Sequence, residues 1–384
     1  MEAYFDNSAT TKVLDSVRDI VVKTMTEDYG NAAAKHRKGM IAEQYIKEAR
    51  AEIAKTLKVT DKEILFTSGG SESNNMALIG TALANQRAGK HIISTAIEHP
   101  SVYNPMGYLE ELGFDITFLP VDHDGHISLQ QLEESIRPDT ILVSVMYVNN
   151  EVGAVEPIEE ISKIIKGKNP NTLLHVDAIQ AYGKYVIRPK KQGIDLLSVS
   201  GHKIHGPKGV GFLYIRTGVK VKPLIYGGGQ QNNMRSGTEN VPGVAGLGVA
   251  AKEMYTDHEA KIQKLIELKD YMTDRMGEIE GTVVNSKKGT DSAPQIVSVS
   301  FAGVRSEVLL HALEDKGIYV SSGSACSSNH PGVSGTLVGI GVSPKLLDST
   351  IRFSLGLFNT KEEIDYCIDT LKELLPVLRR YQRS

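Results

Sequence analysis

The sequence predicts an α/β fold built on a mostly parallel β-sheet with helices on both faces. Short apolar runs alternate with helical patterns along most of the chain, as expected when crossover helices bury both sides of each strand. The 36 glycines suit the many tight loops of such a fold. At 384 residues the chain exceeds one compact core, so two domains are expected.

The large domain is expected to span residues 15–255. An amphipathic segment at 40–57 predicts a helix before a strand at 64–67, and a glycine turn at 69–71 opens a second helix that reaches about Ala84. Six further apolar runs complete a seven-stranded sheet, at residues 92–94, 116–119, 141–145, 173–176, 196–199 and 211–215. Ser128, three residues before Gln131, predicts a capping box at the start of a helix over 128–136.

The small domain is expected to combine residues 1–14 with 256–384. The alternation changes near Lys252, where a long charged helical stretch at 254–280 is interpreted as a connector. An α/β layer follows, with a strand at 296–300, a helix at 306–316, a strand leading into 321–323 and a strand at 351–354. Thr360 and Glu363 predict a second capping box at the start of the closing helix.

Composition excludes several classes of protein. With 41% hydrophobic and 23% charged residues and a net charge of -3, the chain has no basic surplus that would favour nucleic acid or an anionic membrane. Two cysteines, Cys326 and Cys367, are too few for a disulfide framework. The opening residues carry no secretory pattern and no apolar run could span a bilayer, so a cytosolic protein is expected.

Lys203 is the first candidate for chemistry. It follows the apolar run that ends at Ser200, within the segment Ser198-Val-Ser-Gly-His-Lys-Ile-His-Gly-Pro-Lys-Gly-Val-Gly211. A lysine at the carboxyl edge of a parallel sheet faces the crevice where α/β proteins bind ligands, and desolvation there makes its amine nucleophilic. Alone, the motif also fits a surface lysine beside a glycine turn, and the His202-x-x-His205 spacing lacks a third metal ligand.

A carboxylate strengthens this interpretation. Asp177 ends the apolar run Leu174-His-Val and lies 26 positions before Lys203. A carboxylate that faces a pyridine nitrogen keeps the ring protonated, and a protonated ring is the electron sink of pyridoxal phosphate (PLP) chemistry. Asp177 could instead cap the helix expected after it.

Two further strand ends carry polar groups. The turn Gly69-Gly70-Ser71 between a strand and a helix could bind a phosphate with backbone N–H groups, although it lacks Walker spacing. His99, in Glu98-His-Pro-Ser101, could stack on a ring and move protons, or be an ordinary loop histidine.

Taken in order, these motifs resemble the cysteine desulfurases of the NifS/IscS type, which belong to class V of the fold-type-I PLP enzymes. The resemblance runs from Tyr4-Phe-Asp-Asn-Ser-Ala-Thr-Thr11 to the final helix. It includes Val148-Asn-Asn-Glu-Val-Gly153, Arg235-Ser-Gly-Thr-Glu-Asn240, Ser321-Ser-Gly-Ser-Ala-Cys326 and Ile351-Arg-Phe-Ser354.

The resemblance implies a role for each matching residue. Lys203 would bind PLP covalently, Asp177 would pair with the ring nitrogen, Gln180 would reach the ring hydroxyl and His99 would stack on the ring. The phosphate would be held by Gly70, Ser71, Ser200 and His202, and by Thr238 across a homodimer. Asn150 would contact the cofactor, and with Arg352 would hold the substrate carboxylate.

Cys326 distinguishes between the reactions of this family. It lies in the small, polar segment Val320-Ser-Ser-Gly-Ser-Ala-Cys-Ser-Ser-Asn-His-Pro-Gly-Val-Ser334, where the sequence predicts an exposed thiol. The resemblance implies that Cys326 takes sulfur from L-cysteine as a persulfide and passes it to acceptors for iron–sulfur cluster assembly or tRNA thiolation. Because a free thiol is mostly protonated at neutral pH, a base is needed, and His99 is the candidate. Cys367 shares a helical stripe with Ile364 and Ile368 and is interpreted as packing.

Other interpretations are less favoured. The segment 122–126 resembles a calcium loop but has Ile127 where glycine is required, so we expect a strand-to-helix turn. No metal site of its own is expected, although a cluster on a scaffold partner could share Cys326. A selenocysteine lyase, an aminotransferase or another class V enzyme remains the alternative. A non-catalytic member of the fold is opposed by the complete set of Lys203, Asp177 and Arg352. Tyr147, where relatives often have histidine or tryptophan, and the divergent stretch 329–341 leave the acceptor open.

Overall fold

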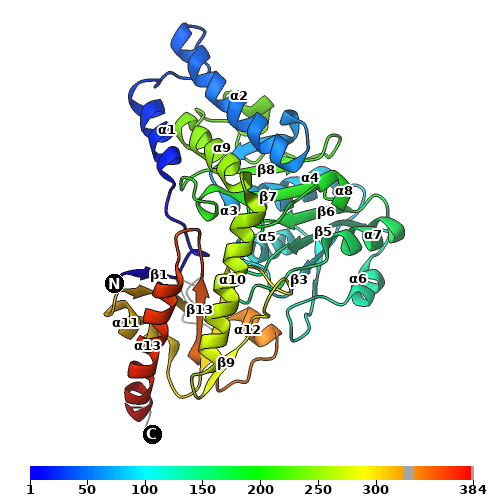
Figure 1. The fold of residues 1–384 in the computed structure, drawn as a ribbon. Coiled ribbons are helices and arrows are strands. Elements are labelled where there is room, and N and C mark those ends of the chain that lie inside the picture. Colours follow the sequence, from blue (N-terminus) through cyan, green and yellow to red (C-terminus); the bar gives the residue numbers. More distant parts are fainter. Residues whose placement is uncertain (323–332, 382–384) are drawn as a thin grey trace.

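A computed structural model describes residues 1–322 and 333–381, and it contains the predicted seven-stranded sheet (Figure 1). The order of the strands is β2-β8-β7-β6-β5-β3-β4, and every pair is parallel except those that β8 forms with β2 and β7. The strands are β2 (Ile64–Thr67), β3 (His91–Thr95), β4 (Asp115–Leu119), β5 (Thr140–Met146), β6 (Leu173–Asp177), β7 (Leu196–Ser200) and β8 (Gly211–Ile215).

Helices cover both faces of this sheet. They are α1 (Asp15–Thr26), α2 (Arg37–Leu57), α3 (Gly70–Asn75), α4 (Thr81–Asn85), α5 (Pro100–Glu111), α6 (Leu129–Ser135), α7 (Ile158–Lys168), α8 (Pro189–Gln192) and α9 (Val241–Tyr255). Neighbouring residues of one strand enter different cores: Leu142 packs with Met106 of α5, whereas Val143 packs in the cluster that contains Ile53 of α2. Two-sided burial explains why the strands are continuous apolar runs.

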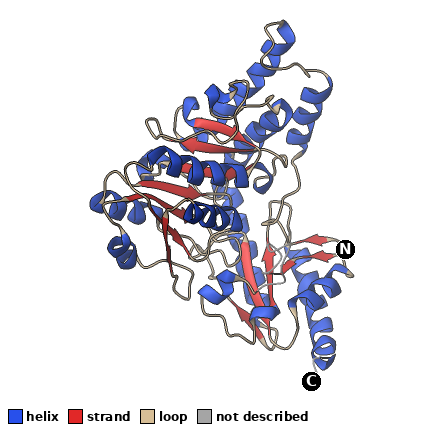
Figure 2. Cartoon of the chain, turned by 180° about the vertical axis from the view of Figure 1, so that it is seen from behind, coloured by secondary structure: helices blue, strands red, loops and turns tan. Residues whose placement is uncertain are grey.

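A second, antiparallel sheet lies apart from the large one (Figure 2). The order of its strands is β12-β13-β10-β9. It contains β9 (Thr282–Val284), β10 (Ile296–Phe301), β12 (Ser321–Ser322) and β13 (Thr350–Ser354), and it packs with α10 (His258–Gly277), α11 (Ser306–Glu314) and α13 (Lys361–Leu378). Near it lie the parallel pair β1 (Ala3–Tyr4) and β11 (Ile318–Tyr319) and the short helix α12 (Gly335–Gly339).

The second sheet has its own hydrophobic core. Phe5 from the start of the chain packs there with Met272 of α10, Phe353 of β13 and Cys367 of α13. Cys367 is fully buried, as the sequence predicts, and burial raises the pKa of its thiol. This core supports the grouping of residues 1–14 with 256–384, and the two-domain division stays a prediction.

The helix boundaries differ from the predictions in two places. The predicted connector at 254–280 is interrupted, because α9 ends at Tyr255 and Asp257 has a left-handed backbone (φ 48°) before α10 begins. Ser128 accepts a hydrogen bond from Gln131 N at 3.3 Å, but the described residues show no reciprocal contact from the Gln131 side chain, so this capping box is only half formed. The capping box of Thr360 and Glu363 is confirmed in both directions.

In the described part of the chain, no helix combines the length and hydrophobicity that a membrane span requires.

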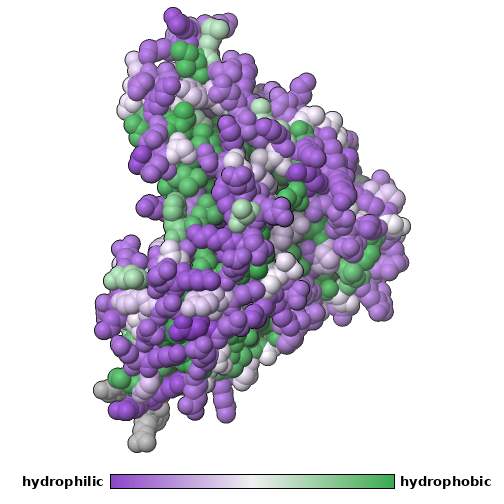
Figure 3. Space-filling view, viewed as in Figure 1, coloured by the Kyte–Doolittle hydropathy of each residue, from purple (hydrophilic) through white to green (hydrophobic). Residues whose placement is uncertain are grey.

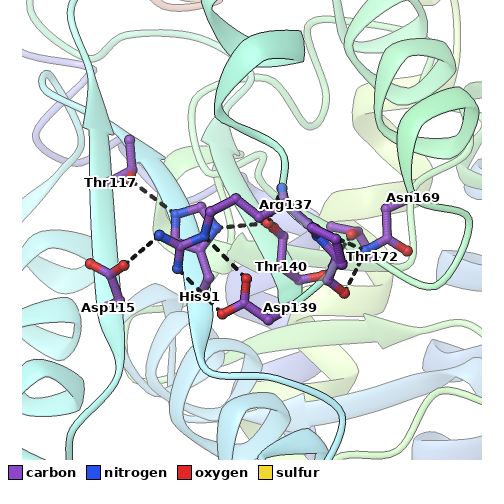
Figure 4. Close-up of polar contacts among 9 residues, drawn as sticks. His91, Asp115, Thr117, Arg137, Asp139, Thr140, Asn169 and Thr172 are labelled. Atoms are coloured by element: carbon purple, nitrogen blue, oxygen red, sulfur yellow. Dashed lines mark hydrogen bonds and ion pairs between the residues drawn. The ribbon is translucent and has the colours of Figure 1, made fainter.

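Polar side chains close the amino edge of the large sheet (Figure 4). His91 at the start of β3 pairs with Thr140 Oγ1 at 2.7 Å and with Thr117 Oγ1 at 2.9 Å, and Arg137 donates to Asp115 and Asp139. Both ring nitrogens of His91 thus have hydrogen-bond partners inside the fold. In α/β sheets of this kind, ligands bind at the opposite, carboxyl edge.

A second buried histidine connects three central strands. His175 of β6 pairs through Nδ1 with Ser144 of β5 at 2.8 Å and through Nε2 with Ser198 of β7 at 2.9 Å. Complete burial lowers the pKa of His175 from its usual value to about 3. The folded protein therefore holds this ring neutral at all moderate pH values.

This burial predicts a pH-dependent stability. The unfolded chain protonates His175 near pH 6.5 and the folded chain only near pH 3, so the free energy of unfolding falls as the pH is lowered through this window. Between pH 6.5 and 4 the loss attributable to His175 is at most about 3 kcal/mol. Denaturant unfolding of the parent and His175→Gln at several pH values checks this, because glutamine can hydrogen-bond without titrating. Equal pH dependence in the two proteins would contradict it.

Candidate active site

A pocket of about 330 Å³ lies at the carboxyl edge of the large sheet, and its size is typical of small-molecule sites. Both sheets and the start of the chain contribute to it. Its lining residues are Asp6, Ser8, Ala9, Gly70, Ser71, His99, Ser101, Met146, Val148, Asn150, Asp177, Ile179, Gln180, Ser200, His202, Lys203, Ser321 and Arg352.

Every site residue predicted from the sequence lines this pocket, except two. Thr238 is exposed and is absent from the lining of its own chain's pocket, which fits a residue predicted to act across a dimer. Cys326 lies outside the described residues. Asp6 and Ser8 were not predicted as site residues, although they belong to the segment Tyr4–Thr11 that carries part of the family resemblance.

Lys203 ends a short 3₁₀ turn, Gly201–Lys203, directly after β7. Its Nζ donates to the main-chain oxygen of Ala9 at 2.7 Å and also to that of Ser8. The main-chain oxygen of Lys203 accepts from Nζ of Lys184 at 2.5 Å. Burial, assisted by the positive charge of Lys203, lowers the pKa of Lys184 to about 7. The amine of Lys203 is thus positioned by the first residues of the chain.

Asp177 is the last residue of β6 and is only 4% exposed. Its Oδ2 accepts from Asn74 Nδ2 at 2.8 Å and its Oδ1 accepts from Ile179 N at 2.9 Å. Burial raises the pKa of Asp177, while these hydrogen bonds oppose the rise. The residues after it form turns and not the helix that it could have capped, so the carboxylate anchors a turn and lines the pocket.

His99 is the N-cap of α5, and this role fixes its tautomer. Its Nδ1 accepts from Ser101 N at 3.1 Å, so in the neutral ring the proton lies on Nε2. Burial lowers the pKa of His99; the negative charge of Asp177 opposes this, and the positive charge of Lys203 adds to it. In this tautomer the neutral ring is a hydrogen-bond donor through Nε2, and it could accept a proton there only after a change to the tautomer with the proton on Nδ1.

The glycine turn before α3 brings the backbone close to the pocket. Gly69 has a backbone conformation (φ 149°) that residues with a side chain rarely adopt. A Cβ at residue 70 would lie 2.3 Å from Ile179 Cδ1, so the close packing there depends on glycine. Next to the turn, Glu72 accepts hydrogen bonds from Arg235 at 2.8 and 3.1 Å. This ion pair ties the segment that carries Thr238 to the first turn of α3.

Arg352 enters the pocket from β13 with only 6% of its side chain exposed. Its Nη1 donates to the main-chain oxygen of Asn150 at 2.8 Å and its Nη2 donates to Asp6 Oδ1 at 3.0 Å. Its Nε is buried and has no hydrogen-bond partner among the residues that the structure describes. A guanidinium with free donors can bind a carboxylate in a planar, two-point arrangement.

The comparisons with known proteins agree with this geometry. The model of the family described as aminotransferase class-V matches residues 3–367. The chain belongs to this family. A relative named "Cysteine desulfurase IscS" from Dictyoglomus turgidum (strain DSM 6724 / Z-1310) is 43% identical over 378 residues, which cover 98% of this chain and 95% of that protein.

Two solved structures confirm the predicted PLP fold type I. One, described as "NIFS-LIKE PROTEIN", has a TM-score of 0.93 at 39% identity and covers 98% of this chain and 100% of its own. Another, described as "SspA in complex with cysteine", has a TM-score of 0.82 at 35% identity and covers 93% of this chain and 100% of its own. The chain lies in the NifS/IscS branch of the family, and its cofactor is pyridoxal phosphate.

The residues present suit this cofactor. The pocket combines a lysine amine, a buried carboxylate that can face a ring nitrogen, and a glycine turn that can offer backbone N–H groups to a phosphate. Ser8 Oγ is buried without a hydrogen-bond partner among the described residues, as expected beside a polar ligand.

Replacing Gly69 by alanine is predicted to weaken cofactor binding. A side chain at φ 149° costs about 1–3 kcal/mol, so the turn should shift and the affinity for pyridoxal phosphate should fall about tenfold. Titration of the cofactor-depleted protein with pyridoxal phosphate, followed by absorbance, measures this. Gly107→Ala in α5 is the control, because a Cβ there meets nothing within 4 Å, and its affinity should not change. Parent-like affinity of Gly69→Ala would contradict the role of the turn.

Proposed function

We propose that this protein is a PLP-dependent cysteine desulfurase that converts L-cysteine into L-alanine and keeps the sulfur as a persulfide on Cys326. The observation that carries the proposal is that Lys203, Asp177 and Arg352, from three distant segments, line one pocket. These are the groups needed to hold the cofactor, to keep its ring protonated and to bind an amino-acid carboxylate.

Several residues of the pocket would bind the cofactor, each at a different part of it. Lys203 would bind it covalently and Asp177 would face the ring nitrogen, while Gln180 would reach the ring hydroxyl and His99 would stack on the ring. The phosphate would be held by Gly70, Ser71, Ser200 and His202. Burial lowers the pKa of His202 to about 4, so this ring would contribute an N–H donor and no charge.

The substrate would be oriented by its carboxylate. Arg352 offers the donors described above, and Asn150 lies beside it. When bound, the cofactor supplies an electron sink for negative charge on the carbon atoms near the substrate amine. The Arg352 side chain is only 6% exposed, and its limited contact with water strengthens its interaction with the carboxylate.

Cys326 would remove the sulfur. Its thiolate attacks the sulfur of the substrate, an S–S bond forms, and the C–S bond breaks. L-Cysteine and one thiol give L-alanine and one persulfide, so the two sulfur atoms together supply two electrons to the substrate carbon and no external oxidant is needed. To take the thiol proton at Nε2, the ring of His99 would need the tautomer with its own proton on Nδ1, where Ser101 Oγ lies at 2.8 Å as a possible acceptor.

The sulfur acceptor, the cellular compartment and the homodimer are also proposed. The persulfide would pass to an acceptor protein for iron–sulfur cluster assembly or tRNA thiolation, and the protein would act in the cytosol. A homodimer is supported by apolar side chains that lie exposed on α1, on the start of α2 and near the segment of Thr238: Val22, Met25, Met40, Ile225 and Tyr226. Figure 3 shows hydrophobic residues at the surface in the region of α1 and α9.

The decisive experiment replaces Cys326 by alanine. The variant should keep the yellow colour of the bound cofactor, because Cys326 does not hold it, and should release less than about one-hundredth of the parent's sulfide from L-cysteine, because no thiol accepts the sulfur. Cys367→Ala is the matched control, since that thiol is buried in the second core, and its turnover should resemble that of the parent. Sulfide and L-alanine are measured together.

The same assay with L-selenocysteine distinguishes a cysteine desulfurase from the alternative, a selenocysteine lyase. A desulfurase requires Cys326 to release sulfide from L-cysteine. Normal sulfide release by Cys326→Ala would contradict the proposal and favour a lyase that needs no thiol.

A further inference from the structure

The carboxylate subsite contains a carboxylate of its own. Asp6 Oδ1 accepts a hydrogen bond from Arg352 Nη2 at 3.0 Å, and both side chains line the pocket. Asp6 is 21% exposed and Arg352 is 6% exposed, so the pair is partly shielded from water. An ion pair in this setting is screened by salt less than a surface pair.

Main-chain hydrogen bonds fix Asp6 in this position. On both sides of Asp6, the backbone pairs with Ser354 at the end of β13: Ser354 N donates to Phe5 O at 2.7 Å and Asn7 N donates to Ser354 O at 3.2 Å. Ser8 N also donates to Ser354 Oγ at 2.8 Å. Because Arg352 lies two residues before Ser354 on the same strand, the backbone holds Asp6 beside the guanidinium.

Asp6 leaves part of the guanidinium available. Nη1 is used by Asn150 and Nη2 by Asp6, while the buried Nε has no partner among the described residues. The other carboxyl group close to Arg352 is that of Glu151, which accepts from Ser334 Oγ at 2.5 Å. Glu151 is absent from the residues that line the pocket, and burial raises its pKa, against the hydrogen bond from Ser334 and the positive charge of Arg352. Asp6 is therefore the main fixed anion that a bound ligand meets at this subsite.

A ligand carboxylate must then share one guanidinium with Asp6. Two carboxylates on the same cation repel each other, and this repulsion weakens the binding of any ligand that brings a carboxylate. L-Cysteine and L-alanine carry the same amine and carboxylate, so a stronger Arg352 subsite would hold the product as well as the substrate. Uniformly tight binding of this kind does not accelerate the chemical step.

We infer that Asp6 is a competing carboxylate that weakens the hold of Arg352 on amino-acid carboxylates and so speeds the release of the alanine product. This inference deepens the proposed function and rests on it. Asp6 acts through Arg352, so it is a positioning residue and takes no part in bond breaking.

Asp6→Asn tests the inference, because the amide oxygen can still accept from Arg352 while the negative charge is removed. The holoenzyme is titrated with L-alanine and, separately, with L-alaninamide, which has the same amine and no carboxylate, and the dissociation constants are measured by calorimetry. The variant should bind L-alanine about three- to tenfold more tightly than the parent and L-alaninamide equally well.

Asp115→Asn is the matched control. Asp115 also pairs with an arginine, Arg137, at 2.7 Å, but at the opposite edge of the sheet (Figure 4), so its loss should leave both affinities unchanged. If Asp6→Asn does not fold, Asp6→Ser removes the same charge and should give the same result.

Two outcomes would overturn the inference in distinguishable ways. Equal or weaker L-alanine binding by Asp6→Asn, with the parent binding normally, shows that Asp6 only orients the guanidinium and leaves the proposed function intact. Failure of the parent itself to bind L-alanine overturns the proposed function, and the role of Asp6 with it.

Discussion

The active site depends on the hydrogen bonds that the first residues of the chain make in two directions. On one side, the segment around Asp6 pairs with Ser354 of β13 in the second sheet. On the other side, the main-chain oxygens of Ser8 and Ala9 accept from Lys203 Nζ, and Thr11 accepts and donates at the turn that carries Lys203. One short segment thus positions both the amine at the end of β7 and the arginine on β13. It acts together with direct contacts between the two parts of the fold, such as the hydrogen bonds from Arg352 to Asn150 O and from Gln295 to Gln180 O.

Most of the fold could be predicted from the sequence, because its signals are local. Strands buried on both faces are continuous apolar runs, and all seven strands of the large sheet were expected within two residues of their bounds. The errors arose where tertiary contacts decide. The backbone at Asp257 divides the predicted connector into α9 and α10, and the Gln131 side chain does not complete the capping box with Ser128. Residues 76–80 form a π-helical segment in place of a regular helix, which no residue type there signals.

The candidate site was predictable where its residues end strands. Lys203, Asp177 and His99 each follow an apolar run, so parallel pairing brings them to one edge of the sheet. Asp6 was not predictable in this way, because its partner Arg352 is separated from it by 346 positions and the pairing is set by long-range backbone contacts. The tautomer of His99 was not predictable either, because only the contact of Nδ1 with Ser101 N indicates that the proton lies on Nε2. Thr238 is exposed in a single chain, so its predicted contact would require a second copy.

The proposed function requires that Lys203, at the end of β7, holds the cofactor. The most direct measurement reduces the holoenzyme with borohydride, digests it, and locates the modified lysine by mass spectrometry. We expect the label on Lys203, while Lys184, which donates to the main-chain oxygen of Lys203 at 2.5 Å, should be unlabelled. A label on Lys184 or on any other lysine would show that Lys203 does not hold the cofactor.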